Sequence, residues 1–305
     1  MTSIIPDGDL VWGLQLPIQS QSTIFVQPWE DAAGPAELAE VAEAADAAGA
    51  FYVAVCDHVA IPQPHDETMS GVWYDTVATL SWLAARTTRT HLLSHVAVLP
   101  YRHALVTAKA WSTLDLLSGG RAILGVGAGH VEAEFELLAL DFAGRGRDLD
   151  DKISRIRAAF ADEIVDGAVM APRPVRPGGP PIWVGGSSPA AIRRAIRLGD
   201  GWLPQGPPEA GMKATIELIR AGRDGRPIDI GGFCEPIFVG SPTWDVGPHT
   251  ATGSPEQVAE RLGRYARSGI SHLQVRFPSR SAAELVEQLT RFGGEVWPAV
   301  TAGRP

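Results

Sequence analysis

The sequence predicts an α/β protein whose strands close into a (β/α)8 barrel, the TIM barrel, and three observations lead to this prediction. Eight short apolar segments alternate along the chain with segments whose apolar residues have helical spacing. Two of the apolar segments, 92–99 and 122–126, lack polar alternation, which indicates parallel strands buried on both faces. The length of 305 residues suits one such barrel. A doubly wound parallel sheet with the same order of elements is the alternative.

The first half of the chain supplies four of the expected strands. They are residues 10–16, 51–56, 92–99 and 122–126, and the helices between them are expected over 35–48, 74–86 and 103–117. Pro35 suits the first turn of a helix, where the N–H that proline lacks has no partner to bind. Gly119 and Gly120 end the third helix, because glycine accepts the left-handed conformation of a helix C-terminus.

The second half begins with an insertion between the fourth and fifth strands, expected over about residues 130–180. It holds two helices, 132–140 and 148–161, and a loop rich in proline and glycine over 171–181. The remaining strands are expected at 182–184, 201–203, within 227–239 and at 271–277; the helices at 190–198, 209–221, from Ser254 onward and at 282–297. The whole chain, 1–305, is expected to form a single domain.

Composition narrows the possible functions. A formal net charge of −9 argues against nucleic acid as a partner, because nucleic-acid binding needs a basic surface. Cys56 and Cys234 are too few for a disulfide framework, which favours a reducing cytoplasmic location. We expect no membrane span, because no run of eighteen apolar residues occurs, and no metal site, because no C-x-x-C or H-E-x-x-H motif occurs.

Residues 99–129 carry a family resemblance. Their sequence, LPYRHALVTAKAWSTLDLLSGGRAILGVGAG, is similar to the signature of the luciferase-like superfamily, in the branch that depends on the deazaflavin coenzyme F420. The resemblance extends from about Leu14 to Phe277. It implies a luciferase-like TIM barrel, commonly a homodimer, with oxidoreductase activity: hydride transfer between F420 and a small organic substrate. Two alternatives stay open, namely an FMN-dependent monooxygenase of the same superfamily and a flavin-binding barrel without catalytic activity.

Asp57 and His58 follow the second expected strand, at the end where barrel enzymes carry their active sites. The unperturbed pKa of a histidine side chain lies near neutrality, which suits transfer of a proton. Asp57 could hold the His58 ring by a hydrogen bond, although sequence neighbours often point apart; an ordinary pair of loop residues is the alternative. The resemblance implies that both residues contact the cofactor ring and favours His58 as the catalytic residue.

Ser94, His95 and Val96 lie in the third expected strand. Two polar side chains among apolar neighbours require hydrogen-bond partners, and satisfied core residues are the ordinary explanation. The resemblance implies instead a non-proline cis peptide bond at His95–Val96, in a bulge that backs the cofactor ring.

Two glycine-rich segments follow the fourth and fifth strands. Gly127, Ala128 and Gly129 do not complete a G-x-G-x-x-G fingerprint, but glycines there allow a planar ring to approach the backbone. Gly185, Gly186 and Ser187 precede a helix whose free N–H groups could bind an anion. The resemblance implies that this second segment holds the cofactor phosphate. Plain turns at the ends of strands are the alternative for both.

Side chains near the expected strand ends are candidates for the substrate wall. Trp12, Trp73, Glu235 and Arg276 are the ones we expect there, and Arg276 is an unusual bare charge near the end of a strand. Glu134 is a further candidate for handling a proton. No substrate can be named from these residues, because the loops that carry them vary freely between enzymes of one fold.

Overall fold

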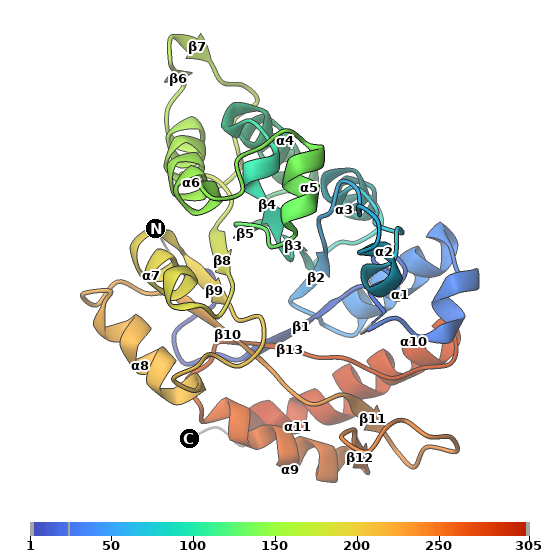
Figure 1. Ribbon diagram of the computed structural model, residues 1–305. Helices are drawn as coiled ribbons and strands as arrows, with labels where there is room; N and C mark the ends of the chain where they lie inside the picture. Colours follow the sequence, from blue (N-terminus) through green and yellow to red (C-terminus); the bar gives the residue numbers. More distant parts are fainter. Residues whose placement is uncertain (1–2, 24, 303–305) are drawn as a thin grey trace.

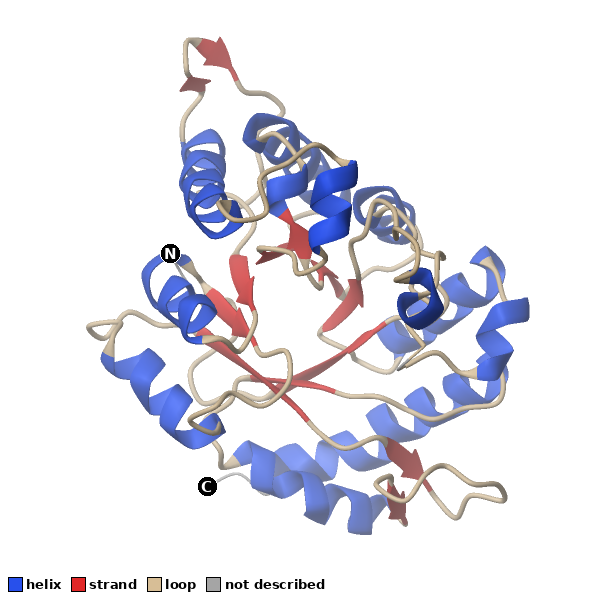
Figure 2. Cartoon of the chain, viewed as in Figure 1, coloured by secondary structure: helices blue, strands red, loops and turns tan. Residues whose placement is uncertain are grey.

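A computed structural model describes residues 3–23 and 25–302 and shows a closed barrel of parallel strands inside a ring of helices (Figure 2). Around the barrel the order is β3-β2-β1-β13-β10-β9-β8-β5, and pairing of β3 with β5 closes it. The strands are β1 Val11–Gln15, β2 Tyr52–Val55, β3 His91–Ser94, β5 Ala122–Gly127, β8 Ile182–Gly185, β9 Gly201–Leu203, β10 Asp229–Phe233 and β13 His272–Gln274. The predicted (β/α)8 barrel is confirmed, and a doubly wound open sheet is excluded.

The third barrel strand consists of two pieces, β3 and β4 (Ala97–Val98). Leu93 pairs with Ile123, whereas Ala97 pairs with Val126. Three residues of the third strand therefore lie opposite two residues of β5, which is a β-bulge. The bulge contains His95 and Val96, and the peptide bond between them is cis, as the family resemblance implied.

Helices follow the strands and pack against one another around the barrel (Figure 1). The ring is formed by α1 Pro35–Ala47, α3 Thr76–Ala84, α4 Ala104–Ser118, α6 Arg145–Ala161, α7 Pro189–Leu198, α8 Met212–Ala221, α9 Pro255–Ala266 and α10 Ala282–Arg291. Capping side chains explain several of the starts: Asp75 accepts a hydrogen bond from the Ala78 N–H, and Ser254 accepts one from Gln257. Gly119 ends α4 with a φ of 69°, as expected from its position.

Short elements lie in the connections. They are η1 Pro28–Ala32, α2 Asp66–Met69, η2 Leu99–Tyr101, α5 Glu132–Leu137, the hairpin β6 Ile164–Val165 with β7 Ala168–Val169, and the parallel pair β11 Ile237–Val239 with β12 Ala251–Gly253. The last predicted helix is divided into α10, a π-helical turn at Phe292–Val296, and α11 Trp297–Ala302. No helix in the described part of the chain is long and apolar enough to cross a membrane.

The region predicted as an insertion is only partly extra to the barrel. Helix α6 packs between α4 and α7, so it serves as the helix of the fourth β/α unit. The additional parts are α5 and the β6–β7 hairpin, which projects from the helical ring in Figure 1. Helix α5 lies after the C-terminal end of β5, where it carries one of the polar residues of the site.

Candidate active site

A buried carboxylate, Glu134 of α5, gathers polar groups at the C-terminal ends of β2 and β5. The Nδ1 atom of His58 lies 2.7 Å from its Oε2 atom, and the Tyr101 hydroxyl donates to the same oxygen at 2.8 Å. The backbone N–H groups of Val59 and Ala60 donate to Oε1 at 2.7 and 3.2 Å. One side chain therefore holds the loop after β2 and the end of η2 together.

These contacts keep Glu134 ionised. Burial alone would raise the pKa of Glu134, but the hydrogen bond and positive charge of His58, together with hydrogen bonds from Tyr101 and Val59, outweigh burial, and the pKa lies below its usual value. An ionised carboxylate accepts hydrogen bonds and does not donate them. The proton of a neutral His58 ring is therefore on Nδ1, which leaves Nε2 with a free lone pair.

The second ring nitrogen of His58 is available for chemistry. Its Nε2 atom has no hydrogen-bond partner in the described part of the chain, and the side chain is 9% exposed. The Trp73 ring meets the imidazole edge-on at 4.4 Å between centroids, and the His130 ring lies at 5.9 Å. Burial lowers the pKa of His130, and the nearby His58 lowers it further. His58 thus presents one basic nitrogen in a confined aromatic setting.

Asp57 does not hold His58, so the predicted Asp57–His58 hydrogen bond is wrong. Both Asp57 oxygens bind the guanidinium of Arg102, at 2.6 and 2.7 Å, and Asp57 also accepts hydrogen bonds from Thr76 and from the Val98 N–H. Successive residues of an extended chain point to opposite sides, which turns Asp57 toward η2 and His58 toward α5. Asp57 fixes the strand-end loops, and Glu134 orients the histidine.

The bulge residues are packed into the barrel. The Ser94 hydroxyl donates to the Gly125 carbonyl at 2.8 Å, so this serine is a satisfied core residue. The Nε2 atom of His95 has no partner in the described structure, and burial lowers the pKa of His95 to about 4. That these residues lie behind a cofactor ring stays a prediction.

The glycines at the ends of β5 and β8 make room for protein atoms. A Cβ at Gly127 would lie 2.5 Å from the Cγ2 atom of Val96, and a Cβ at Gly185 would lie 2.7 Å from the Cγ1 atom of the same valine. Gly129 has a φ of 81° and packs against Phe135, with Ala128 before it. The glycines thus accommodate the bulged third strand, and their contact with a cofactor remains a prediction.

The loop between β8 and α7 has free N–H groups. Ser187 is fixed by a hydrogen bond from its hydroxyl to the Gly206 carbonyl at 2.6 Å, and Ser188 caps α7. No hydrogen bond among the described residues uses the N–H of Ser187 or Ser188. Together with the first turn of α7, these groups suit an anion. Neighbouring Arg194 is bound to Asp150 and does not contribute.

Two of the four predicted substrate residues lie elsewhere. Trp12 is 1% exposed and packs against Phe292 at 5.1 Å and Trp297 at 6.4 Å, because its side chain points from β1 toward the C-terminal helices. Glu235 is bound to Arg264 at 2.6 Å and to the Tyr265 hydroxyl at 2.9 Å, both of α9. The prediction that Trp12 contacts substrate is therefore wrong, and the same prediction for Glu235, which is engaged with α9, stays untested.

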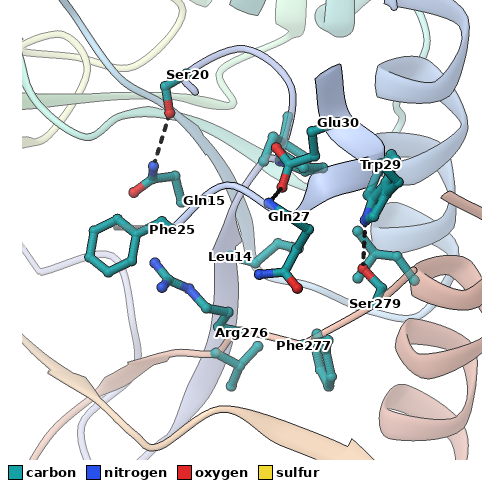
Figure 3. A pocket seen from close by; sticks show the side chains of 14 residues that line it. Leu14, Gln15, Ser20, Phe25, Gln27, Trp29, Glu30, Arg276, Phe277 and Ser279 are labelled. Atoms are coloured by element: carbon teal, nitrogen blue, oxygen red, sulfur yellow. Dashed lines mark hydrogen bonds between the residues drawn. The ribbon is translucent and has the colours of Figure 1, made fainter. Parts of the chain in front are cut away.

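The other two predicted substrate residues lie at the C-terminal end of the barrel, and their contact with substrate stays a prediction. Trp73 contacts His58, and Arg276 lines a small cavity between the ends of β1 and β13 (Figure 3). Tyr101 and His130 lie beside His58 and Glu134 but were not predicted, although Tyr101 stands in the segment that carries the family resemblance and His130 directly follows it. Among the described residues, no cluster of three or more histidine, cysteine or acidic side chains could hold a metal ion.

Comparison with known proteins adds a family match. A sequence model of the family described as luciferase-like monooxygenase matches residues 18–239, which is more than half of the chain. An uncharacterized protein of Mycobacterium tuberculosis is 36% identical over 155 residues, 48% of this chain and 53% of that protein. The F420-dependent glucose-6-phosphate dehydrogenase of Nakamurella multipartita is 34% identical over 207 residues, 63% of this chain and 58% of that enzyme. Both alignments span less than two thirds of the relative's own length.

Solved structures agree on the fold. An F420-dependent secondary alcohol dehydrogenase, determined with an F420–acetone adduct, superimposes with a TM-score of 0.75 at 17% identity and covers 96% of this chain and 99% of its own. The oxygenating constituent of 3,6-diketocamphane monooxygenase from Pseudomonas putida was determined with FMN. It superimposes with a TM-score of 0.73 at 15% identity and covers 95% of this chain and 98% of its own. At such identities these likenesses support the barrel and not a choice of cofactor.

Proposed function

We propose, from the premise that this chain belongs to the luciferase-like monooxygenase family, that it is an oxidoreductase that uses coenzyme F420 to transfer a hydride to or from a small organic substrate. The observation that carries the proposal is the His58–Glu134 contact. It presents a basic imidazole nitrogen at the C-terminal end of a TIM barrel, where enzymes of this fold bind their substrates.

The described residues fit a phosphate-bearing cofactor. The N–H groups of Ser187 and Ser188, at the start of α7, have the donor chemistry that a cofactor phosphate needs. His58 and Trp73 supply a confined aromatic setting for the reacting part of a planar ring. When bound, F420 would supply hydride chemistry at C5 of its deazaflavin.

His58 would manage the proton that accompanies the hydride. On oxidation of an alcohol, its Nε2 atom would accept the hydroxyl proton; on reduction of a carbonyl, the protonated ring would return it. Glu134 would remain ionised, hold the ring in one orientation and stabilise its protonated form. Trp73 and His130 would limit the access of water to the same nitrogen.

F420 is favoured as the cofactor by the sequence relatives. Proteins named as F420-dependent glucose-6-phosphate dehydrogenase are 31–35% identical to the chain over their aligned regions. The second candidate is an FMN-dependent monooxygenase that uses reduced flavin and oxygen. It is favoured by the description of the matching family.

Adding each cofactor to the purified protein separates the candidates. We expect F420 fluorescence to be quenched saturably and FMN to bind more weakly. Secondary alcohols and their ketones would then be screened by following the absorbance change of F420. Tighter binding of FMN with consumption of oxygen would favour the monooxygenase. Binding of a cofactor without turnover of any substrate would favour a non-catalytic flavin-binding barrel.

A further inference from the structure

Arg276 is a largely buried cation without an anionic partner. It follows β13, and its guanidinium lies 3.6 Å from the centroid of the Phe25 ring. No ion pair or side-chain hydrogen bond of Arg276 occurs within residues 3–23 and 25–302. Burial lowers the pKa of Arg276, although an arginine stays charged at any physiological pH. Because an unpaired buried charge is costly, binding of an anion at this cavity would offset part of that cost.

The cavity beside Arg276 has room for a small organic group. Its volume is about 60 Å³, several times what one water molecule requires. Gln15, Ser20, Gln27 and Ser279 supply polar atoms to its wall, and Figure 3 shows the guanidinium turned toward Phe25 and Gln15. The polar atoms of Arg276 are not sealed off, because none is among the fully buried, unpartnered atoms of the described chain.

Glu30 is the acidic residue of this cavity, but its oxygens are already occupied. One accepts the Ile18 N–H at 2.7 Å and the other the Gln27 N–H at 2.8 Å, and Glu30 forms no ion pair with Arg276. The carboxylate therefore shapes the loop after β1 and leaves the guanidinium edges free. Its negative charge also makes the cavity unfavourable for a dianion, so a singly charged group suits it better.

The cavity adjoins the environment of His58. The Gln15 amide donates to the Ser20 hydroxyl at 3.3 Å, and Ser20 forms an isolated β-bridge with Trp73. The Trp73 ring in turn contacts the imidazole. A continuous chain of contacts therefore links the wall of the cavity to His58.

We propose that Arg276 binds a carboxylate of the substrate, so that the substrate class is small organic acids that also carry an alcohol or carbonyl group. A planar carboxylate matches the fork of one guanidinium through two parallel hydrogen bonds. The assignment of this anion to the substrate rests on the proposed function, but binding of the anion itself does not.

Binding can be measured on the whole chain without added cofactor. Butyrate and benzoate would be titrated by calorimetry, with butyramide and benzamide as uncharged matches and inorganic phosphate as a different anion. We expect both carboxylates to bind more tightly than their amides. Arg276→Gln should raise the carboxylate Kd at least tenfold and leave the amide Kd unchanged. Arg276→Lys should give a carboxylate Kd between those of the wild type and Arg276→Gln, because lysine keeps the positive charge and lacks the two parallel N–H donors of the guanidinium.

Two controls make the result specific. Arg280→Gln removes an exposed arginine nearby that is bound to Glu284, and it should not change the carboxylate Kd. His58→Asn should bind the carboxylates normally, so a failed proposal for His58 and a failed proposal for Arg276 give different results. If Arg276→Gln does not fold, Arg276→Lys carries the test. Equal binding of acid and amide, an unchanged Kd in the Arg276 variants, a preference for phosphate, or no carboxylate binding would each overturn the proposal.

Discussion

At the scale of single residues, His58 has one ring nitrogen on Glu134 and the other without a partner among the described residues. The change His58→Asn keeps a polar side chain and removes the imidazole that would accept the proton. If His58 transfers a proton, turnover at saturating cofactor and substrate should fall about 10²–10⁴-fold. The Kd for the cofactor should change little, because the proposed phosphate contacts lie at α7. Stopped-flow turnover and a fluorescence titration measure the two quantities separately.

The pH profile provides the control for this prediction. The wild-type pH profile of turnover should contain a limb set by protonation of the His58 ring, and the variant should lack that limb. Undiminished turnover with the wild-type profile would end the catalytic assignment of His58. A raised cofactor Kd with normal turnover would make His58 a ring contact only.

Side-chain direction is what the sequence could not supply at this scale. The place of His58 after an apolar strand could be predicted, but its hydrogen-bond partner stands 76 positions away in the sequence. Asp57, Trp12 and Glu235 also stand at or near strand ends, and each turns toward a structural partner. Only the packed fold decides which way each side chain points.

At the scale of elements, the start of α7 is the proposed phosphate site. Ser187→Asp places a carboxylate beside the N–H groups that would bind the phosphate. It should raise the Kd for F420 well over tenfold, which corresponds to about 1.4 kcal/mol or more. Ser187→Asn is the uncharged match and should have a much smaller effect. The same F420 affinity in both variants, each shown to be folded by circular dichroism, would remove this loop from the site.

Ser187 is a better position than Gly186 for a substitution that tests the phosphate site. Gly186 has a φ of 110°, where any side chain is strained, and its N–H donates to the Leu203 carbonyl.

The contacts of the glycines in β5 and β8 could be predicted only in part. The sequence predicted that glycines there allow a close approach, but it could not show that Val96 of the bulge is the group that approaches.

At the scale of the whole molecule, the barrel could be predicted because strand and helix periodicities alternate eight times. The elements that escaped prediction are those without such periodicity, such as the β11–β12 pair and the π-helical turn. The homodimer and the cytoplasmic location stay predictions, as does the single-domain organisation.

Histidines buried inside the barrel should make the whole fold sensitive to acid. His272 is 1% exposed and stacks on Trp183 at 4.3 Å, and burial lowers its pKa to about 3; burial lowers the pKa of His95 to about 4. In the unfolded chain a histidine titrates near pH 6.5. Below that pH the unfolded chain binds protons that the barrel does not accept, so protonation favours unfolding. Above it, neither state is protonated and no penalty exists.

The free energy of unfolding should therefore fall by about 1.4 kcal/mol per pH unit for each such histidine below pH 6.5, until the pH reaches the lowered pKa. His272→Phe keeps an aromatic ring against Trp183 and cannot be protonated. Urea unfolding would be measured at pH 7.5, 6.5, 5.5 and 4.5. The free energy of unfolding of this variant should fall less steeply with decreasing pH than that of the wild type, and the difference in slope should correspond to about one proton bound on unfolding. His249→Phe, at an exposed position, should keep the wild-type slope. A wild-type slope in His272→Phe would mean that the barrel accepts the proton, and that the interior around His272 and His95 is open to water.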